Sequence, residues 1–547
     1  MVTERSEMDR MTSAAEVPSQ RDTCLQLRNF FLRIVLKIWL TFRYILDYVI
    51  DLVFGYFYDE TKRQHIPPVR DPLLMESAIS LAEKIRNREV SAVVVVQAFV
   101  DRIKEVNTVL NAVVDNRFVL AIQEAKEVDK LLESGSLSVE QIKQKKPFLG
   151  VPFTTKDSTA CKGLRHTLGL VSRRQVLADE DADVVILMKE AGAILIAVTN
   201  IPEVNMWIEV RNNVYGQTLN PYNTTRTVGG SSGGEAAIIA AVGSPLGVGT
   251  DIGGSIRLPA FCCGIFGHKP TSGLTPLKGL TRRTGKEEHT MVSAGPMCKY
   301  AQDLAPFLQV LVGSNISKLQ LFAEVNLAKV QFMYMEQLKD PRASSVYEDL
   351  LLPLRQAVTH FQCLSEKPVV KISLPGMRYS FRLWRYWMSK EPFYFPKELA
   401  NREGEVSLWV ELLKKLVGCS EFTLAAIMLL AAQKFPKEKP EWAEEATERL
   451  RAELLEKLGE DGVLLFPSSS MPAHYHYASL LRPYNFSYFC IFNALHLPVT
   501  QVPMGLNKDG LPVGIQVVAA PYKDHLCFAV AKELQKAFGG WVPPFKV

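Results

Sequence analysis

The sequence has few cysteines and no large excess of either charge. Its nine cysteines include no C-x-x-C pair, so we expect reduced thiols rather than a disulfide framework. With 63 basic and 58 acidic residues, the formal net charge of +5 is too small to predict a nucleic-acid partner. A phosphate-binding loop of the form G-x-x-x-x-G-K-[ST] is also missing. At 547 residues, 47% of them hydrophobic, the chain can build a core without a metal.

The N-terminal region divides into two parts. Residues 1–23 are polar and charge-rich, which predicts disorder. Residues 24–58 are largely apolar and aromatic. On a helical wheel of residues 30–57 the interrupting charges fall within an arc of about 120°; these charges are Arg33, Lys37, Arg43, Asp47 and Asp51. We predict a membrane-associated amphipathic helix, with a transmembrane span and a helix packed on its own domain as alternatives.

The globular body is predicted over residues 60–547. Helical and strand patterns alternate along its first part, which is typical of an α/β fold. The predicted helices are 74–88, 91–106, 117–133 and 181–191, and the predicted strands are 148–155 and 193–199. A second apolar segment, at 406–435, favours a pair of core helices, and a membrane-facing cap is the alternative.

The most unusual stretch is a glycine- and serine-rich run at 227–259. Such runs let backbone N–H groups converge on an anion. Gly229 to Gly233 satisfies G-x-S-x-G, the motif of an α/β-hydrolase, but that fold also needs an acid and a late histidine, for which His525 is the candidate. The other possibility is a serine hydrolase without histidine, in which a buried lysine of lowered pKa takes the serine proton.

Lys156 is the candidate for such a base. It directly follows a short apolar strand, where a lysine is unexpected. A lysine at a strand end more often extends to solvent, so its position alone does not identify a base.

Three blocks of the sequence, in the order lysine, serine, serine, resemble the signature of the amidase signature family. They are GVPFTTKD at 150–157, GGSSGGE at 229–235 and GTDIGGSIR at 249–257. The resemblance covers roughly residues 70–545. Within the family the chain is most similar to the membrane-associated fatty-acid amide hydrolases of the second type, through FCCGIFGHKP at 261–270 and FGGWV at 538–542. The fold that it implies is a three-layer α/β/α sandwich with a large mixed β-sheet.

The resemblance also implies catalytic roles. Ser255 is the expected nucleophile, and Ser231 is expected to relay protons between Ser255 and a neutral Lys156. The peptide bond before Ser231 is cis in the family. The oxyanion hole is expected from the backbone N–H groups of Ile252, Gly253, Gly254 and Ser255. Met206 and Trp207 are expected to bind substrate beside its acyl group.

The activity implied is hydrolysis of fatty-acid amides to free fatty acid and amine through an acyl-enzyme, with no cofactor and no metal. Membrane lipid is an expected partner, nucleic acid is not, and the resemblance suggests a homodimer. We expect a membrane location, at the endoplasmic reticulum or another intracellular membrane. One alternative is an amidase of small polar amides or an amidotransferase-type subunit, against which the apolar segments argue. The other is a catalytically silent, membrane-anchored binding protein, against which the intact lysine and serines argue.

Overall fold

The computed structural model describes residues 20–58, 60–287 and 290–546. The chain forms two compact units, Met1–Val49 and Ile50–Val547. The predicted disorder of 1–23 falls mostly on residues 1–19, outside the described residues, while residues 20–23 are helical.

The N-terminal helix α1 runs from Gln20 to Phe57, close to the predicted 24–58. Arg43 and Asp47 form an i,i+4 ion pair on it, with Nε and Oδ2 3.5 Å apart. Among the described residues, no helix has both the length and the apolar character that crossing a membrane requires. The transmembrane alternative is therefore not supported.

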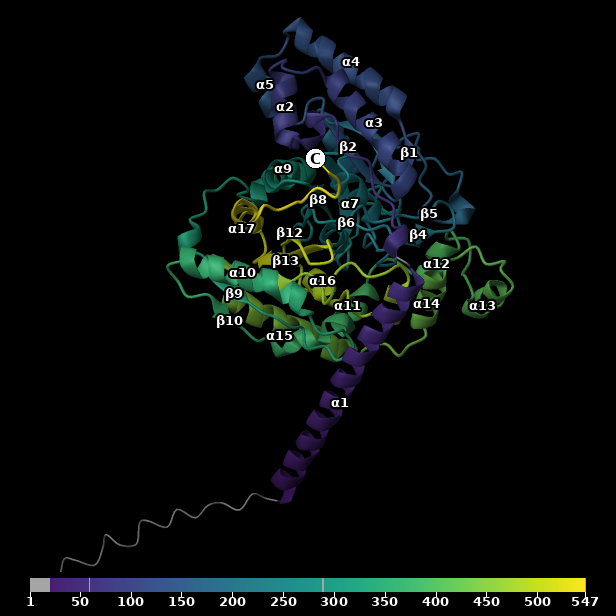
Figure 1. Cartoon of the computed structure of the whole chain (residues 1–547), viewed down its shortest axis with the longest axis vertical. Helices are drawn as coiled ribbons and strands as arrows, with labels where there is room; N and C mark the ends of the chain where they lie inside the picture. Colours follow the sequence, from purple (N-terminus) through teal and green to yellow (C-terminus); the bar gives the residue numbers. More distant parts are fainter. Residues whose placement is uncertain (1–19, 59, 288–289, 547) are drawn as a thin grey trace, which may run out of the picture. The chain divides into compact units, whose positions relative to one another are not determined.

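A mixed sheet of eleven strands forms the centre of the second unit (Figure 1). In spatial order the strands are β1 (Val113–Asn116), β3 (Ile194–Thr199), β2 (Pro152–Lys156), β6 (Leu246–Asp251), β8 (Ser293–Cys298), β7 (Phe266–Lys269), β12 (Val499–Leu506), β13 (Pro512–Ala519), β11 (Gly462–Pro467), β9 (Gln331–Tyr334) and β10 (Val370–Lys371). Strands β3, β2 and β6 run parallel, as do β11, β9 and β10, and the remaining pairs are antiparallel. The predicted large mixed sheet is confirmed. A separate short hairpin joins β4 (Arg211–Asn212) to β5 (Gly216–Gln217).

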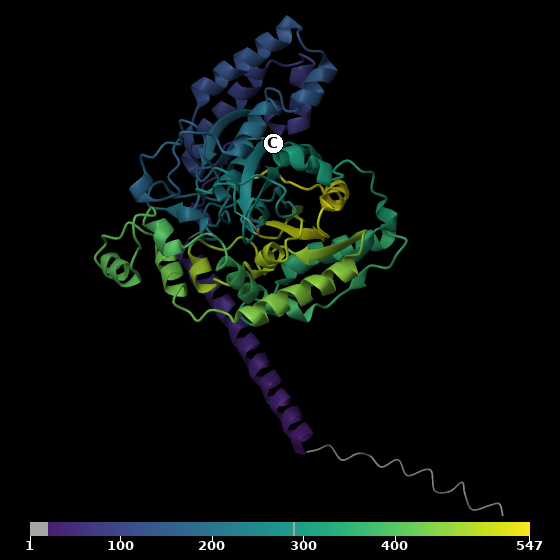
Figure 2. The same cartoon turned by 180° about the vertical axis from the view of Figure 1, so that it is seen from behind.

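Helices pack on both faces of this sheet (Figures 1 and 2). After α1, the α-helices of the described residues are α2 (Ala78–Arg86), α3 (Ala92–Leu110), α4 (Phe118–Ser134), α5 (Val139–Lys145), α6 (Asp183–Glu190), α7 (Gly233–Ala240), α8 (Arg257–Cys262), α9 (Leu304–Val312), α10 (Glu348–Leu364), α11 (Ser380–Met388), α12 (Phe395–Leu399), α13 (Leu408–Leu416), α14 (Leu424–Ala432), α15 (Pro440–Leu458), α16 (Ser487–Ala494) and α17 (Asp524–Phe538).

Strand β11 shows how the two layers arise. Side chains alternate between the faces of a strand. Val463 and Leu465 accordingly join the hydrophobic cluster that contains residues of α10 and α17. Leu464 and Phe466 join the cluster that contains residues of α15 and α16. Both faces of this strand are buried, so its sequence is a continuous apolar run.

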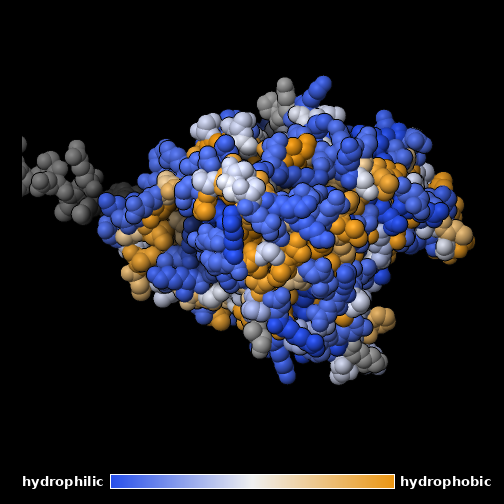
Figure 3. Space-filling view, turned by 90° about the horizontal axis from the view of Figure 1, so that it is seen from above, coloured by the Kyte–Doolittle hydropathy of each residue, from blue (hydrophilic) through white to orange (hydrophobic). Residues whose placement is uncertain are grey.

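The apolar segment at 406–435 forms α13 and α14, but the expected pair of buried core helices is wrong for α13. Trp409, Leu413 and Leu416 on this helix are 71%, 67% and 84% exposed. Ile427 and Leu430 of α14, by contrast, are buried. The periodicity correctly predicted two helices, yet the same apolar pattern suits a core and an exposed docking surface. Elsewhere, the view in Figure 3 shows a largely hydrophilic surface with smaller hydrophobic groups among the polar ones.

Candidate active site

The predicted site residues gather where three parallel strands end. Lys156, Thr199 and Asp251 are the last residues of β2, β3 and β6. Because neighbouring parallel strands end at the same edge of a sheet, the chain following them forms one crevice. The glycine- and serine-rich run supplies the loop before α7, which carries Ser231, and the loop after β6, which carries Ser255.

Lys156 is completely buried and does not extend to solvent. Its Nζ donates hydrogen bonds to Ser231 Oγ at 2.9 Å and to Thr250 Oγ1 at 2.8 Å. Burial lowers the pKa of this amine from 10.5 to about 7, although the nearby carboxyl groups of Asp251 and Glu235 act in the opposite direction. A large fraction of the lysine is therefore neutral at neutral pH, as a base requires.

Glu235, in the first turn of α7, lies close enough to influence Lys156. Its carboxyl group accepts hydrogen bonds from Thr154 and Thr199, each at 2.8 Å. Burial raises its pKa to about 8. Burial thus favours the neutral form of this carboxyl group, as it favours the neutral amine of Lys156.

Ser231 is placed by unusual backbone geometry. The Gly230–Ser231 peptide bond is cis, as the resemblance implied. Gly230 approaches another segment so closely that an added Cβ would lie 2.6 Å from the carbonyl oxygen of Trp207. Only glycine fits at this position.

A buried ion pair holds the loop after β6. Asp251 and Arg257 are both completely buried, with Nε and Oδ2 3.1 Å apart. Arg257 holds the pKa of the Asp251 carboxyl well below its usual range despite the burial. The guanidinium also donates to Phe489 O, Gln516 Oε1 and Asn493 Oδ1, so both charges are fully hydrogen-bonded.

Three of the four N–H groups predicted for the oxyanion hole have no protein acceptor among the described residues: those of Ile252, Gly253 and Ser255. The fourth, that of Gly254, donates to Asp251 Oδ1 at 2.8 Å and so anchors the turn. Gly254 has a φ of +114°, and a Cβ there would lie 2.4 Å from Phe489 Cβ. The turn therefore requires glycine to present the neighbouring N–H groups.

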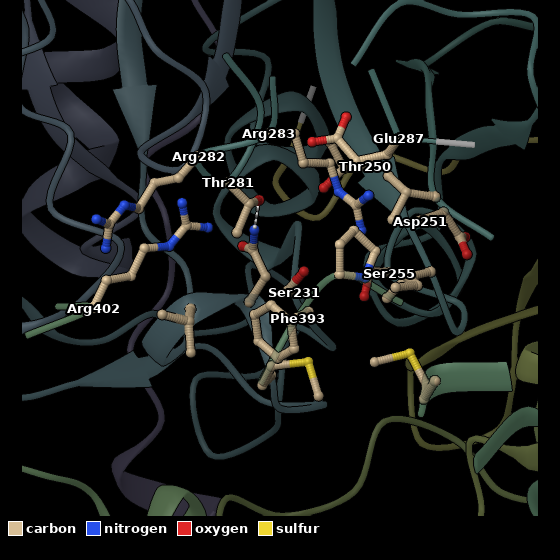
Figure 4. A pocket seen from close by; sticks show the side chains of 17 residues that line it. Ser231, Thr250, Asp251, Ser255, Thr281, Arg282, Arg283, Glu287, Phe393 and Arg402 are labelled. Carbon is tan, nitrogen blue, oxygen red and sulfur yellow. Dashed lines mark hydrogen bonds between the residues drawn. The ribbon is translucent and has the colours of Figure 1, made fainter. Parts of the chain in front are cut away.

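Ser231 and Ser255 line one cavity, with Thr250, Asp251 and Ile252 (Figure 4). Within the described ranges their two hydroxyls make no hydrogen bond to each other, so the predicted relay is formed from Lys156 to Ser231 only. Met206, one of the two residues expected to bind substrate, also lines the cavity. Trp207 is not among the lining residues, and its indole Nε1 donates to Ser479 Oγ at 3.2 Å.

Histidine takes no part in this cavity as far as the described residues show. His525, the candidate base of an α/β-hydrolase, lies in the first turn of α17 and is not a lining residue. The described residues likewise contain no cluster of side chains that could hold a metal ion.

Sequence reasoning missed three arginines that line the same cavity: Arg282, Arg283 and Arg402. Apolar residues on the segments around them line it too, namely Val204, Val292, Met388, Pro392 and Phe393. The arginines lie outside the three blocks and belong to irregular segments without a repeating pattern. No signal in the sequence marked them.

The family model described as Amidase matches residues 94–528. The chain therefore belongs to the amidase family and is an amide-hydrolysing enzyme.

Two curated relatives align over nearly the whole chain. Fatty-acid amide hydrolase 2 of Homo sapiens is 44% identical over 491 residues, covering 88% of this chain and 92% of that protein. Fatty-acid amide hydrolase 2-A of Danio rerio is 43% identical over the same length and the same shares.

Solved structures support the fold. A fatty acid amide hydrolase structure has a TM-score of 0.70 at 20% identity and covers 86% of each chain. A peptide amidase from Stenotrophomonas maltophilia has a TM-score of 0.66 at 22% identity, covering 86% of this chain and 99% of that one. At such identities the likeness establishes the fold and not the substrate.

Proposed function

We propose that the enzyme hydrolyses fatty-acid amides, with Ser255 as nucleophile and Lys156 as base. Ser255 Oγ attacks the carbonyl carbon while its proton passes to Ser231 Oγ and the Ser231 proton passes to Lys156 Nζ. The tetrahedral intermediate then expels the amine, which receives the proton back along the same path. Water hydrolyses the acyl-enzyme by the same relay and releases the fatty acid.

The observation that carries this proposal is the contact between Lys156 and Ser231. The 2.9 Å bond joins a serine hydroxyl to an amine whose pKa is about 7, so the base is available at the pH of the cell. Proton transfer from Ser255 to Ser231 needs Ser255 Oγ to turn toward Ser231 Oγ, and both side chains line the same cavity. We assign stabilisation of the oxyanion to the N–H groups of Ile252, Gly253 and Ser255, each contributing about 3 kcal/mol.

Two observations support a fatty-acid amide as the substrate. The chain is 44% identical to a protein named fatty-acid amide hydrolase 2, over 92% of its length. The cavity that holds the two serines also has apolar walls, among them Met206, Met388 and Phe393, against which an alkyl chain can pack.

We also propose that the enzyme acts at a membrane surface. Large hydrophobic side chains on the described part of α1 face solvent, among them Ile38, Tyr44 and Leu52 at 64%, 66% and 61% exposure. Helix α13 exposes a second set, which includes Leu413. Exposed apolar faces of this size favour docking to lipid, in which fatty-acid amides dissolve.

The test is release of free oleate from oleoyl amides by the detergent-solubilised full chain, with Ser255→Ala beside the wild type. Ser272→Ala is the matched control, because that hydroxyl has no hydrogen-bond partner in the described part of the chain and Ser272 does not line the cavity. We expect activity and fluorophosphonate labelling in the wild type and the control, and neither in Ser255→Ala. Labelling without oleate release would reject fatty-acid amides as substrates, and labelling of Ser255→Ala would reject the nucleophile.

A further inference from the structure

Three arginines line the cavity, and among the described residues they have two carboxylates as ion-pair partners. Arg283 Nη2 pairs with Glu391 at 2.8 Å. Arg282 and Arg402 share a single carboxylate, that of Glu398, at 3.8 Å and 2.7 Å. Three guanidinium groups therefore face two carboxylates.

Charges of both signs surround these ion pairs, and the carboxylate of Glu403 also acts on Arg282. Arg173 lies close to Arg282, and both Arg173 and Arg282 donate to the side chain of Asn401. Burial, and then the positive charge of Arg402, lower the pKa of Arg282. Glu287 also lines the cavity, and its carboxylate accepts hydrogen bonds from the backbone N–H groups of Thr284 and Gly285, which fix its position in the loop.

Arg283 has an unused donor within this site. Its side chain is nine-tenths buried, at 10% exposure. Its Nη1 is buried and has no hydrogen-bond partner among the described residues. Because an unpaired buried donor is unfavourable, this nitrogen is prepared for an acceptor that arrives with a ligand. Figure 4 shows Arg283 around the same cavity as Ser231 and Ser255.

The backbone under these arginines is strained. Thr281 and Arg282 have φ values of +48° and +61°, and the Arg283 N–H donates to Leu280 O to close the turn. Asn401 and Arg402 form a second left-handed pair, with φ values of +55° and +68°. Residues other than glycine rarely adopt this left-handed backbone conformation, and such strain is concentrated at functional sites.

We propose that Arg282, Arg283 and Arg402 form a carboxylate-binding subsite, so that the preferred substrates are fatty amides whose amine portion is an amino acid. This rests on the proposed hydrolysis of fatty-acid amides. The carbonyl group of the substrate joins an alkyl chain to an amine portion. A wall of guanidinium groups is a poor surface for the alkyl chain. The arginine wall therefore takes the amine portion, and a planar carboxylate fits the guanidinium fork.

The test compares N-oleoylglycine with N-oleoylethanolamine, which differ in a carboxylate and a hydroxymethyl group. We expect the wild type to favour N-oleoylglycine in kcat/KM by about tenfold or more, the size of one charge-assisted hydrogen bond. The double variant Arg282→Gln/Arg402→Gln and the single variant Arg283→Lys should each lose most of this preference. The control is Lys286→Gln, which removes a charge from the same loop outside the cavity and should keep the preference.

Two further measurements keep the outcome clear. Because charge attraction is screened, raising the salt concentration should lower the wild-type preference without any substitution. If the wild type favours the neutral amide, or if the preference is unchanged in the variants, the carboxylate-binding subsite is refuted, while the proposed hydrolysis of fatty-acid amides stands. If neither amide is hydrolysed, binding of N-oleoylglycine to Ser255→Ala is measured by calorimetry, with and without the added substitutions Arg282→Gln/Arg402→Gln. Loss of binding on adding these substitutions supports the subsite, and unchanged binding refutes it.

Discussion

Replacing Lys156 with methionine should stabilise the protein while it inactivates the enzyme. Burial lowers the pKa of this lysine from 10.5 to about 7. A shift of about 3.5 units, at about 1.36 kcal/mol each, means that keeping the amine in the fold costs about 5 kcal/mol at pH 7. Its two hydrogen bonds, to Ser231 and Thr250, return about 2 kcal/mol. Lys156→Met should therefore raise the free energy of unfolding by about 3 kcal/mol at pH 7.

The change in the free energy of unfolding caused by Lys156→Met depends on pH, and its sign reverses at high pH. Between pH 7 and 10.5 the unfolded chain holds a proton that the folded chain has lost, so the cost shrinks as pH rises. Near pH 10.5 the cost has nearly vanished, and the variant should be the less stable protein because it lacks two hydrogen bonds. Below pH 7 both states of the wild type are protonated, and the gain stays at its maximum.

The assay is denaturant unfolding of wild type and Lys156→Met, followed by tryptophan fluorescence at pH 7 and pH 10, beside the rate of amide hydrolysis. The rate should fall by about 10²- to 10⁴-fold, as expected when a general base is lost. Wild-type kcat/KM should rise with pH through about 7 and then level off, because the neutral amine is the active form. Lys299→Met is the control, since Lys299 is also buried with a pKa of about 7, but its Nζ donates to the carbonyl oxygen of Leu74 and not to a serine of the cavity. A variant less stable than wild type at pH 7 would refute the reasoning.

Three other substitutions test the surroundings of the site. Gly254→Ala should abolish amide hydrolysis in the activity assay and lower the melting temperature, because φ is +114° and the new Cβ would meet Phe489. Asp251→Asn should cost about 3–5 kcal/mol in denaturant unfolding, since Arg257 would keep a buried, unpaired charge; a cost below about 1 kcal/mol would contradict this. Leu413→Glu should weaken flotation with lipid vesicles and leave hydrolysis in detergent unchanged, and equal flotation would argue against α13 as a docking surface.

Much of the fold and the centre of the site could be predicted from the sequence. Helices α3, α4 and α6 and strand β3 lie within a few residues of their predicted ranges, because hydrophobic periodicity marks them directly. The position of Lys156 was predictable from its block, although burial of the amine was not. Lys269 and Lys299 are equally buried, also with pKa values of about 7, so a lowered pKa does not by itself identify a catalytic lysine.

What the sequence did not reveal depends on contacts between distant segments. The arginine wall combines Arg282 and Arg283, on a strained turn without glycine, with Arg402 from a segment over a hundred residues later. The two left-handed residues of this turn, Thr281 and Arg282, are neither glycine nor asparagine, the residues that usually mark such a conformation in a sequence. The exposure of α13 was also missed, since an apolar helix face has one pattern whether it meets a core or solvent.

The hydrogen-bond partners of Arg257 determine how much of the chain must be synthesised before the active-site loop can form. The guanidinium that secures the loop of Ser255 depends on Gln516, which lies 259 residues further along the chain. On a ribosome, both serines and Lys156 emerge long before this partner exists, and Arg257 has no complete set of acceptors until then. A nascent chain, or a product truncated before β13, therefore carries every catalytic residue proposed here without the rigid loop that makes them a working site.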